Sequence, residues 1–283
     1  MPARKIKYLS QCPPHPHHIF YKEWGDIHNQ NALFCAHGLT RNSGDFDYFC
    51  SKMEEHYHII CPDMPGRGQS DWLAKDEYHY SVYMADAGTL IAQLGAKRLD
   101  WVGTSMGGLM GMILASQPNT PIRKLVINDV GPFASRASQL TIGKYAGNDE
   151  RFNTFEEVTT YFKNLYAAWG NVSEDQWLSV AKQSSRVLED GTYALAYDPA
   201  IVAPLKGNVD ALEDISIWPV YEAIQIPMLL LHGAESTIVP AALVEEMKQR
   251  NKNLEVVDFP GIGHAPSLME DYQVNLVREW LRK

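Results

Sequence analysis

The segment Trp101-Val102-Gly103-Thr104-Ser105-Met106-Gly107-Gly108 contains a Gly-X-Ser-X-Gly pentapeptide. The apolar residues at 99–102 predict a strand before it, and the run at 109–115 predicts a helix after it. A strand that runs straight into a helix needs a sharp turn, in which glycine leaves room where a Cβ would clash. The same pentapeptide also occurs as a glycine-rich turn with a solvated serine, so the rest of the chain has to decide between the two interpretations.

Such a turn carries a chemical consequence. It would hold Ser105 in a strained conformation with its hydroxyl above the sheet, and the N–H of Met106, at the positive end of the following helix, would face the reacting atoms. A second N–H could come from Leu39, which follows a predicted strand at 32–36 in the sequence His37-Gly38-Leu39. For Leu39 a plain strand-to-helix turn is the alternative.

Composition sets the class of protein. A chain of 283 residues with 45% hydrophobic residues can form one large domain, or one domain with an insertion. A formal charge of −9 and scattered basic residues argue against a nucleic-acid partner. We see no apolar window long enough for a bilayer and no signal peptide, and therefore expect no membrane partner. The cysteines show no paired spacing, which favours free thiols in a reducing cytoplasm; they are Cys12, Cys35, Cys50 and Cys61.

Alternating strand-like and helix-like segments predict an α/β fold, with a mostly parallel central sheet and helices on both faces. The pattern changes after residue 132, where polar and aromatic helix-like segments such as 155–169 and 174–187 replace the alternation, and it resumes near 223. We therefore expect a core of residues 1–132 and 223–283 and an inserted helical cap of residues 133–222.

A histidine partner for Ser105 is predicted from its loop. His264 lies in a glycine-flanked loop after the last predicted strand, where its ring can reach the carboxyl edge of the sheet. Imidazole has a suitable pKa to accept the proton of a serine hydroxyl at neutral pH. A surface-turn histidine is the alternative. His37 and His232 end strands beside glycines and are expected to bond backbone groups, and the tract around His17 is interpreted as solvated rather than as a metal site.

Four segments resemble proteins of the α/β-hydrolase fold, of the esterase/lactonase type. They are His37-Gly38, Asp63-Met64-Pro65-Gly66-Arg67-Gly68-Gln69-Ser70, Gly103-Thr104-Ser105-Met106-Gly107 and Gly263-His264-Ala265-Pro266. The resemblance covers nearly the whole chain and is weakest across the cap. It implies a Ser–acid–His triad with Ser105 and His264, and an oxyanion hole formed by the N–H groups of Leu39 and Met106. A serine at position 105 speaks against the related haloalkane dehalogenases and epoxide hydrolases, which use aspartate there.

The acid is the point at which this sequence departs from the pattern. Members of the family usually place it fifth in a His-Gly-x-x-Asp motif, but here that position is Ser236, which cannot replace a carboxylate. We prefer Asp129, at the end of the strand predicted at 124–128, where ligand sites of open α/β sheets gather. Glu235 is the alternative acid. Asp129 could instead merely cap the turn into Gly131.

These residues predict a serine hydrolase that needs no cofactor or metal and acts on small carboxylic esters or lactones through an acyl-enzyme. Cap aromatics such as Trp169 and Trp177 are expected to cover an apolar pocket, more of them as cap core than as substrate contacts. Arg41 could bind a substrate carboxylate or be solvated. The alternatives are a carbon–carbon bond hydrolase of ring-cleavage products, a lyase or cofactor-free oxygenase, and a small-molecule sensor. The oligomeric state is not indicated.

Overall fold

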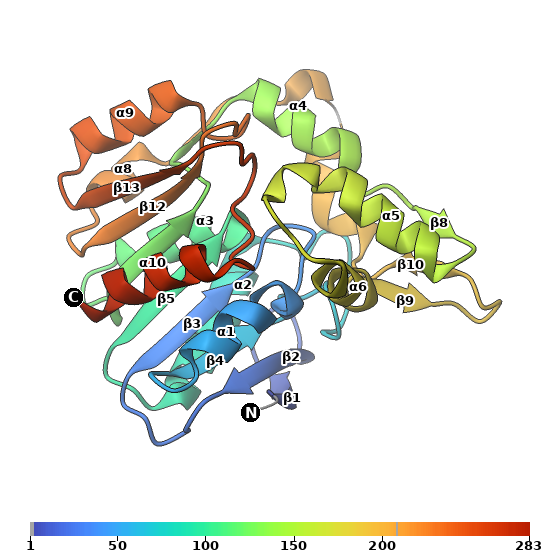
Figure 1. Cartoon of the computed structure of the whole chain (residues 1–283), viewed down its shortest axis with the longest axis horizontal. Helices are drawn as coiled ribbons and strands as arrows, with labels where there is room; N and C mark the ends of the chain where they lie inside the picture. The colour runs from blue at the N-terminus through green and yellow to red at the C-terminus, as the bar shows by residue number, and fades with distance from the viewer. Residues whose placement is uncertain (1–2, 208) are drawn as a thin grey trace.

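A central sheet forms the middle layer of the protein. The computed structural model describes residues 3–207 and 209–283. The strands of the sheet are β1 (Arg4–Ser10), β2 (His17–Trp24), β3 (Ala32–Ala36), β4 (His58–Pro62), β5 (Leu99–Thr104), β6 (Ile122–Asn128), β12 (Met228–Gly233) and β13 (Leu254–Phe259). They form an 8-stranded sheet in the order β1-β2-β4-β3-β5-β6-β12-β13 (Figure 1). Only the β1–β2 and β2–β4 pairs are antiparallel. The predicted mostly parallel sheet is confirmed.

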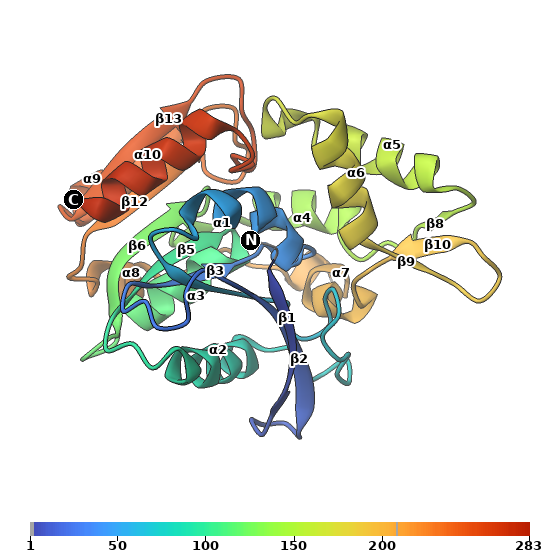
Figure 2. The ribbon, with the colours of Figure 1, turned by 60° about the horizontal axis from the view of Figure 1, so that its bottom comes forward.

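Helices cover both faces of this sheet, as Figure 2 shows for α1 and α10 on one side and α2 and α3 on the other. The helices of the predicted core ranges are α1 (Asp47–Met53), α2 (Tyr80–Leu94), α3 (Met106–Ala115), α9 (Ala241–Arg250) and α10 (Asp271–Arg282), with the 3-10 turn η1 (Ser43–Phe46) before α1. Helix α8 (Trp218–Glu222) ends the segment that separates the two ranges. The buried apolar residues of α1 and α10 belong to one hydrophobic cluster, and those of α2, α3 and α9 belong to the other. Because helices cover both faces of the sheet, both sides of each inner strand are buried, and the sequences of these strands are continuous apolar runs.

Residues 133–207 and 209–222 contribute no strand to the central sheet. Figures 1 and 2 show α5 and α6 of this segment beside the core. Its elements are β7 (Phe133–Ala134), α4 (Arg136–Tyr145), β8 (Arg151–Phe152), α5 (Phe155–Leu165), η2 (Ala167–Trp169), α6 (Glu174–Gln183), β9 (Ser185–Val187), β10 (Tyr193–Leu195), η3 (Pro199–Val202), α7 (Ala203–Lys206), η4 (Val209–Ala211) and β11 (Ile215–Ser216), followed by α8. The boundaries of a separate cap at 133 and 222 stay a prediction.

The predicted helical segment at 174–187 is wrong at its end. Helix α6 stops at Gln183, and the next residues form β9, which pairs with β10. Ser185, Arg186 and Val187 are mixed in polarity and gave no periodicity to separate strand from helix. Backbone pairing with Tyr193–Leu195, across the short turn at residues 188–192, decides the strand.

The interpretation of the histidine tract as solvated is also wrong for His17. Its side chain is 2% exposed, and its Nε2 lies 3.1 Å from Asp86 Oδ2 on α2. Asp86 also accepts a hydrogen bond from Ser10. The pair ties the β1–β2 hairpin to α2, a contact between residues 69 positions apart that the sequence pattern does not reveal.

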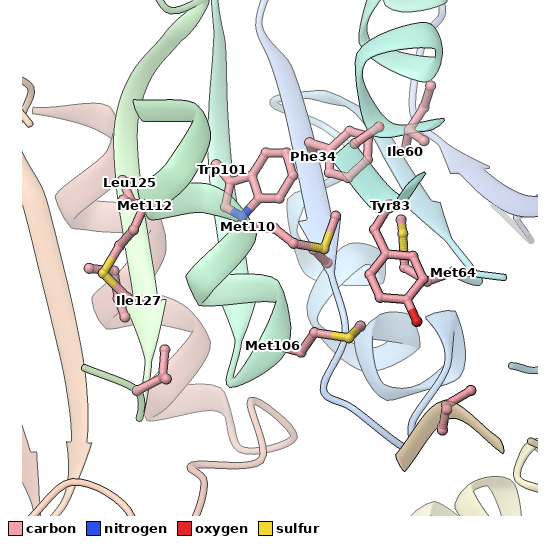
Figure 3. Close-up of a cluster of buried hydrophobic side chains, with 14 of the residues drawn as sticks. Phe34, Ile60, Met64, Tyr83, Trp101, Met106, Met110, Met112, Leu125 and Ile127 are labelled. Carbon is pink, nitrogen blue, oxygen red and sulfur yellow. The ribbon is translucent and has the colours of Figure 1, made fainter. Parts of the chain in front are cut away.

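An apolar cluster supports the turn that follows β5 (Figure 3). Trp101 on β5 stacks on Phe34 of β3 with ring centres 4.5 Å apart, and both side chains are fully buried. The indole N–H of Trp101 donates to the carbonyl oxygen of Gly107 at 2.9 Å. Figure 3 shows Met106 and Met110 of α3 beside this pair. Burial of each such side chain stabilises the folded state by about 2–3 kcal/mol. The start of α3 is therefore held against β5 and β3 by this packing.

None of the helices within residues 3–207 and 209–283 combines the length and the apolar character needed to cross a membrane.

A glycine substitution tests the packing of this turn. A Cβ on Gly107 would lie 2.1 Å from the carbonyl oxygen of Ala36, so either the backbone of β3 or α3 must move. We expect Gly107→Ala to lower the free energy of unfolding by about 3 kcal/mol or more, as measured by urea unfolding. Gly88→Ala is the matched control, because nothing lies within 4 Å of its added Cβ. That change in the exposed face of α2 should raise stability by about 0.5–1 kcal/mol. Equal unfolding midpoints for the two variants would contradict the close approach.

Candidate active site

Ser105 occupies the turn between β5 and α3, in a conformation that side chains seldom adopt. Its backbone has φ 50° and ψ −112°. A Cβ on Gly103 would lie 2.2 Å from the carbonyl oxygen of Gly107, and Gly107 itself abuts Ala36. Both flanking glycines are therefore required by close backbone contacts. The strain, of order 1–3 kcal/mol for such a residue, is held by the packing on both sides of the turn.

His264 connects Ser105 to Asp129. Its Nε2 lies 3.1 Å from Ser105 Oγ, and its Nδ1 lies 2.8 Å from Asp129 Oδ2. A carboxylate only accepts, so Nδ1 carries the proton and Nε2 is free to accept the hydrogen of the Ser105 hydroxyl. The structure thus brings together three residues that are separated by up to 159 positions in the chain.

Asp129 is held on both carboxylate oxygens. It follows β6 with φ 51°, and its side chain is completely buried. The N–H of Gly233 donates to Oδ1 at 3.0 Å, while the Ser236 hydroxyl donates to Oδ2 at 2.5 Å. These donors compensate for the burial of a carboxylate in the absence of a lysine or arginine partner.

Glu235, the alternative acid, has an exposed side chain. Its backbone N–H donates a hydrogen bond to the carbonyl oxygen of Ile262 at 2.9 Å. Within the described residues the carboxylate that contacts His264 is that of Asp129. The neighbouring Ser236 is the residue whose role sequence reasoning missed. It was considered only as a failed acid, although a hydroxyl at that position can donate to a carboxylate on the next strand.

Two backbone N–H groups are open toward the cavity beside Ser105. Leu39 and Met106 both line this cavity, and among the described residues neither N–H has a hydrogen-bond acceptor. Met106 is the first residue of α3, where the helix leaves its N–H groups unpaired and carries partial positive charge. The position suits a developing negative charge on an oxygen bound to Ser105.

Arg67 fixes the surroundings of these two residues. Its side chain is fully buried. Its Nε donates to the carbonyl oxygen of Leu39 at 2.8 Å, and its Nη2 lies 3.6 Å from Met106 Sδ. Nη1 donates to the carbonyl oxygen of Pro65 and to the hydroxyl of Tyr83. The sequence indicates only that Arg67 holds its own loop; its contact with the Leu39 peptide was not predicted.

Asp63 and His37 are backbone-binding residues in the same region. Asp63 accepts from the N–H groups of Ser43 and Gln69, at 2.7 and 2.9 Å, and burial raises the pKa of its carboxyl. His37 Nε2 accepts from the N–H of Met64, so its Nδ1 donates to the carbonyl oxygen of Gly38. Burial lowers the pKa of His37 to about 3, which keeps the ring neutral. These residues shape the loop and do not contact Ser105.

A cavity of about 390 Å³ opens over Ser105 and His264. Its walls come from the loops of the core and from the segment after β6, and they are mostly apolar and aromatic. The aromatic side chains of the wall include Tyr80, Tyr83, Tyr145, Tyr166 and Trp169. The buried Trp177 and Tyr197 do not line it. They pack within residues 133–207 and 209–222, which we call the cap segment. The volume suits a small molecule.

Arg41 lies in the wall of this cavity and is not solvated. Its side chain is 6% exposed and forms an ion pair with Asp45, in which Nε and Nη2 lie 3.0 and 2.5 Å from the two carboxylate oxygens. Burial opposes its charge, but the Asp45 carboxylate outweighs this effect and the pKa of Arg41 is raised. Arg41 therefore remains charged in an apolar environment.

Among the described residues, one group of three or more His, Cys, Asp or Glu side chains lies close enough together to hold a metal ion, and it consists of three cysteines. The Sγ atoms of Cys35, Cys50 and Cys61 lie within 4.8 Å of one another and are buried. Thiolates in such an arrangement suit a soft cation. None of the three lines the cavity at Ser105, so the cluster is separate from the candidate site.

Comparisons with known proteins show which family this chain resembles over most of its length. The profile of the alpha/beta hydrolase fold family matches residues 31–271. A 3-hydroxybutyrate-oligomer hydrolase of Cupriavidus necator is 39% identical over 95% of both chains. A bifunctional esterase/perhydrolase of Acinetobacter calcoaceticus is 25% identical over 91% of this chain and 93% of its own. The structure of an alpha/beta hydrolase from Novosphingobium aromaticivorans superposes with a TM-score of 0.86 at 30% identity, over 99% of this chain and 98% of that one.

These relatives confirm the predicted class of enzyme, a hydrolase of the ester-acting kind. The family match extends over most of the chain and includes β3, the turn at Ser105, Asp129 and His264. The chain belongs to the α/β-hydrolase fold family.

Proposed function

We propose that this protein hydrolyses carboxylic esters with Ser105 as nucleophile, His264 as general base and acid, and Asp129 as the acid of a catalytic triad. The proposal rests on two hydrogen bonds at His264: its Nε2 accepts from the Ser105 hydroxyl, and its Nδ1 donates to the Asp129 carboxylate. A serine hydroxyl becomes a useful nucleophile when a base within hydrogen-bond distance accepts its proton.

The proposed reaction has two steps. Ser105 Oγ attacks the ester carbonyl carbon while its proton passes to His264 Nε2, and the charged oxygen of the intermediate is stabilised by the N–H groups of Leu39 and Met106. His264 then donates this proton to the leaving alcohol, and an acyl-enzyme remains on Ser105. A water then loses its proton to His264 and attacks the acyl carbon; the bond from that carbon to Ser105 Oγ breaks, His264 returns the proton to Oγ, and the acid is released. Each backbone donor of this kind contributes about 3–4 kcal/mol in studied enzymes.

For the substrate we propose short esters of hydroxy acids, in particular oligomers of 3-hydroxybutyrate. The 3-hydroxybutyrate-oligomer hydrolase of Cupriavidus necator, 39% identical over 95% of both chains, supports this choice. The cavity of about 390 Å³ is also of a size for a dimer or trimer of so small an acid. Each bond within such an oligomer is a carboxylic ester, so the proposed triad applies to it unchanged.

The first test is hydrolysis of the 3-hydroxybutyrate dimer and trimer and of p-nitrophenyl butyrate by purified protein. We expect turnover of both classes, and its loss by at least about 10³-fold in Ser105→Ala. An inert wild type would contradict ester hydrolysis. Turnover of a ring-cleavage dienoate alone would then favour carbon–carbon hydrolysis, and tight ligand binding without turnover would favour a sensor.

A paired substitution tests the proposed acid. Asp129→Asn should lower kcat by on the order of 10³–10⁴-fold, because an amide can donate its NH2 to Nδ1 and favour the wrong tautomer of His264, and because it carries no charge to stabilise the imidazolium. Glu235→Gln is the control and should retain the wild-type rate, because Glu235 is exposed and away from the cavity wall. The reverse pattern would assign the acid to Glu235.

Ser236 is proposed as a positioning residue that acts through Asp129. Loss of its hydrogen bond to Oδ2 in Ser236→Ala should lower kcat about tenfold, or ~1.4 kcal/mol, with little change in KM. Ser236→Thr keeps a hydroxyl and should restore most of kcat. The neighbouring exposed Thr237→Ala serves as control. A Ser236→Ala enzyme with the wild-type kcat would show that the hydroxyl does not assist the acid.

A further inference from the structure

Arg41 is an unusual side chain for an apolar cavity wall. Among the described residues of the wall, Arg41 and Asp45 are the only aspartate, glutamate, lysine or arginine. Asp45 engages the Nε and Nη2 side of the guanidinium. Among the described residues Nη1 is buried and has no acceptor in hydrogen-bond geometry, although the Tyr166 hydroxyl is close enough to contribute to the raised pKa of Arg41. A charged donor left without an acceptor in an apolar region is costly, so this edge of the guanidinium is suited to an anion that arrives with the substrate.

The guanidinium is held in place by the cap segment. Its central carbon lies 5.3, 5.0 and 5.3 Å from the ring centres of Phe162, Tyr166 and Trp169. Together with the two bonds to Asp45, these contacts restrict the side chain to one orientation. A fixed guanidinium loses little conformational entropy when it binds a carboxylate, which favours recognition.

The Arg41 side chain begins close to that of Ser105, the proposed nucleophile. A Cβ built on Gly38 would lie 3.6 Å from Arg41 Cγ and 3.8 Å from Ser105 Cβ. The two side chains thus flank the same glycine, on the loop that carries Leu39. Arg41 and Ser105 thus line the same cavity from neighbouring starting points.

We infer that Arg41 Nη1 binds a free carboxylate on the leaving alcohol of the substrate and thereby selects hydroxy-acid esters over neutral esters. In a 3-hydroxybutyrate dimer this carboxylate is separated from the ester oxygen by two carbons, so both groups fit within the one cavity that Arg41 and Ser105 line. The inference rests on the proposed function, since it names the group of the ester that the site recognises. Cleavage next to the carboxyl end would release one 3-hydroxybutyrate at a time.

The experiment compares the 3-hydroxybutyrate dimer with its terminal primary amide. Both contain one ester bond and have the same length, but only the first carries the carboxylate. We expect wild-type kcat/KM to be at least tenfold higher for the acid, mainly through KM. Arg41→Gln should lower kcat/KM for the acid by tenfold or more and leave the amide within twofold. Arg41→Lys should retain part of the preference, because it keeps the charge and loses the planar fork.

Two controls separate recognition from structure. Arg186→Gln removes another arginine that lies over an aromatic ring, Trp72, but does not line the cavity, and it should keep the wild-type preference. The double variant Arg41→Gln/Asp45→Asn avoids leaving a buried carboxylate without its partner, and it should show the same selective loss as Arg41→Gln. Equal cleavage of acid and amide by the wild type, or an equal loss on both in the Arg41 variants, would overturn the inference.

A binding measurement keeps this inference separate from the proposed reaction. Calorimetric titration of Ser105→Ala, which needs no turnover, should show at least tenfold tighter binding of the dimer acid than of its amide, and Arg41→Gln in the Ser105→Ala background should abolish the difference. If wild type cleaves neither dimer but this difference is present, the proposed reaction fails and the inference stands. If both dimers are cleaved and bound equally, the inference fails and the proposed reaction stands.

Discussion

The site depends on the close contact between the start of α3 and the end of β3. Gly107 packs so tightly against the carbonyl oxygen of Ala36 that a methyl group has no room, and Trp101 binds the carbonyl of Gly107 from below. These contacts force the chain to turn at Ser105, which accepts the strained φ of 50°. The same turn directs the hydroxyl toward His264 and leaves the N–H of Met106 unpaired. A single packing constraint therefore accounts for the position of the proposed nucleophile and of one of the two proposed oxyanion donors.

The acid shows how a hydrogen-bond network can accommodate a departure from a family pattern. The position where related proteins usually carry the acid is Ser236, while the carboxylate stands on the neighbouring strand end at Asp129. The two residues are joined directly, because Ser236 donates to the oxygen of Asp129 that also faces His264. With Gly233 on the other oxygen, the buried carboxylate has a donor for each side. Ser236 thus supports the proposed acid through a hydrogen bond, although it stands at the position where related proteins carry the acid itself.

What could be predicted from the sequence is local. The strand–turn–helix pattern around Ser105, the loop of His264 and the strand end at Asp129 are each legible within a few residues, and chain order suggested that they meet. Contacts between distant segments were not legible. Nothing near Arg67 indicates that it binds the Leu39 peptide, and nothing near His17 indicates a buried bond to Asp86. The clustering of three cysteines from β3, α1 and β4 likewise depends on the sheet order. The strand at Ser185–Val187 exists only through its pairing with β10.

Arg41 joins the two parts of the chain on which substrate choice depends. Its backbone belongs to the core loop beside Ser105, whereas its guanidinium lies against aromatic rings of α5 and η2. A change in the position of these rings would therefore change the position of the charge relative to the nucleophile. Because the charge is buried and Nε and Nη2 are already paired with Asp45, an anion can reach Nη1 only if the side chains that cover it move. In the proposed reaction the reacting groups are thus set by the core, and the position of the Arg41 charge relative to Ser105 depends on how α5 and η2 pack on Arg41.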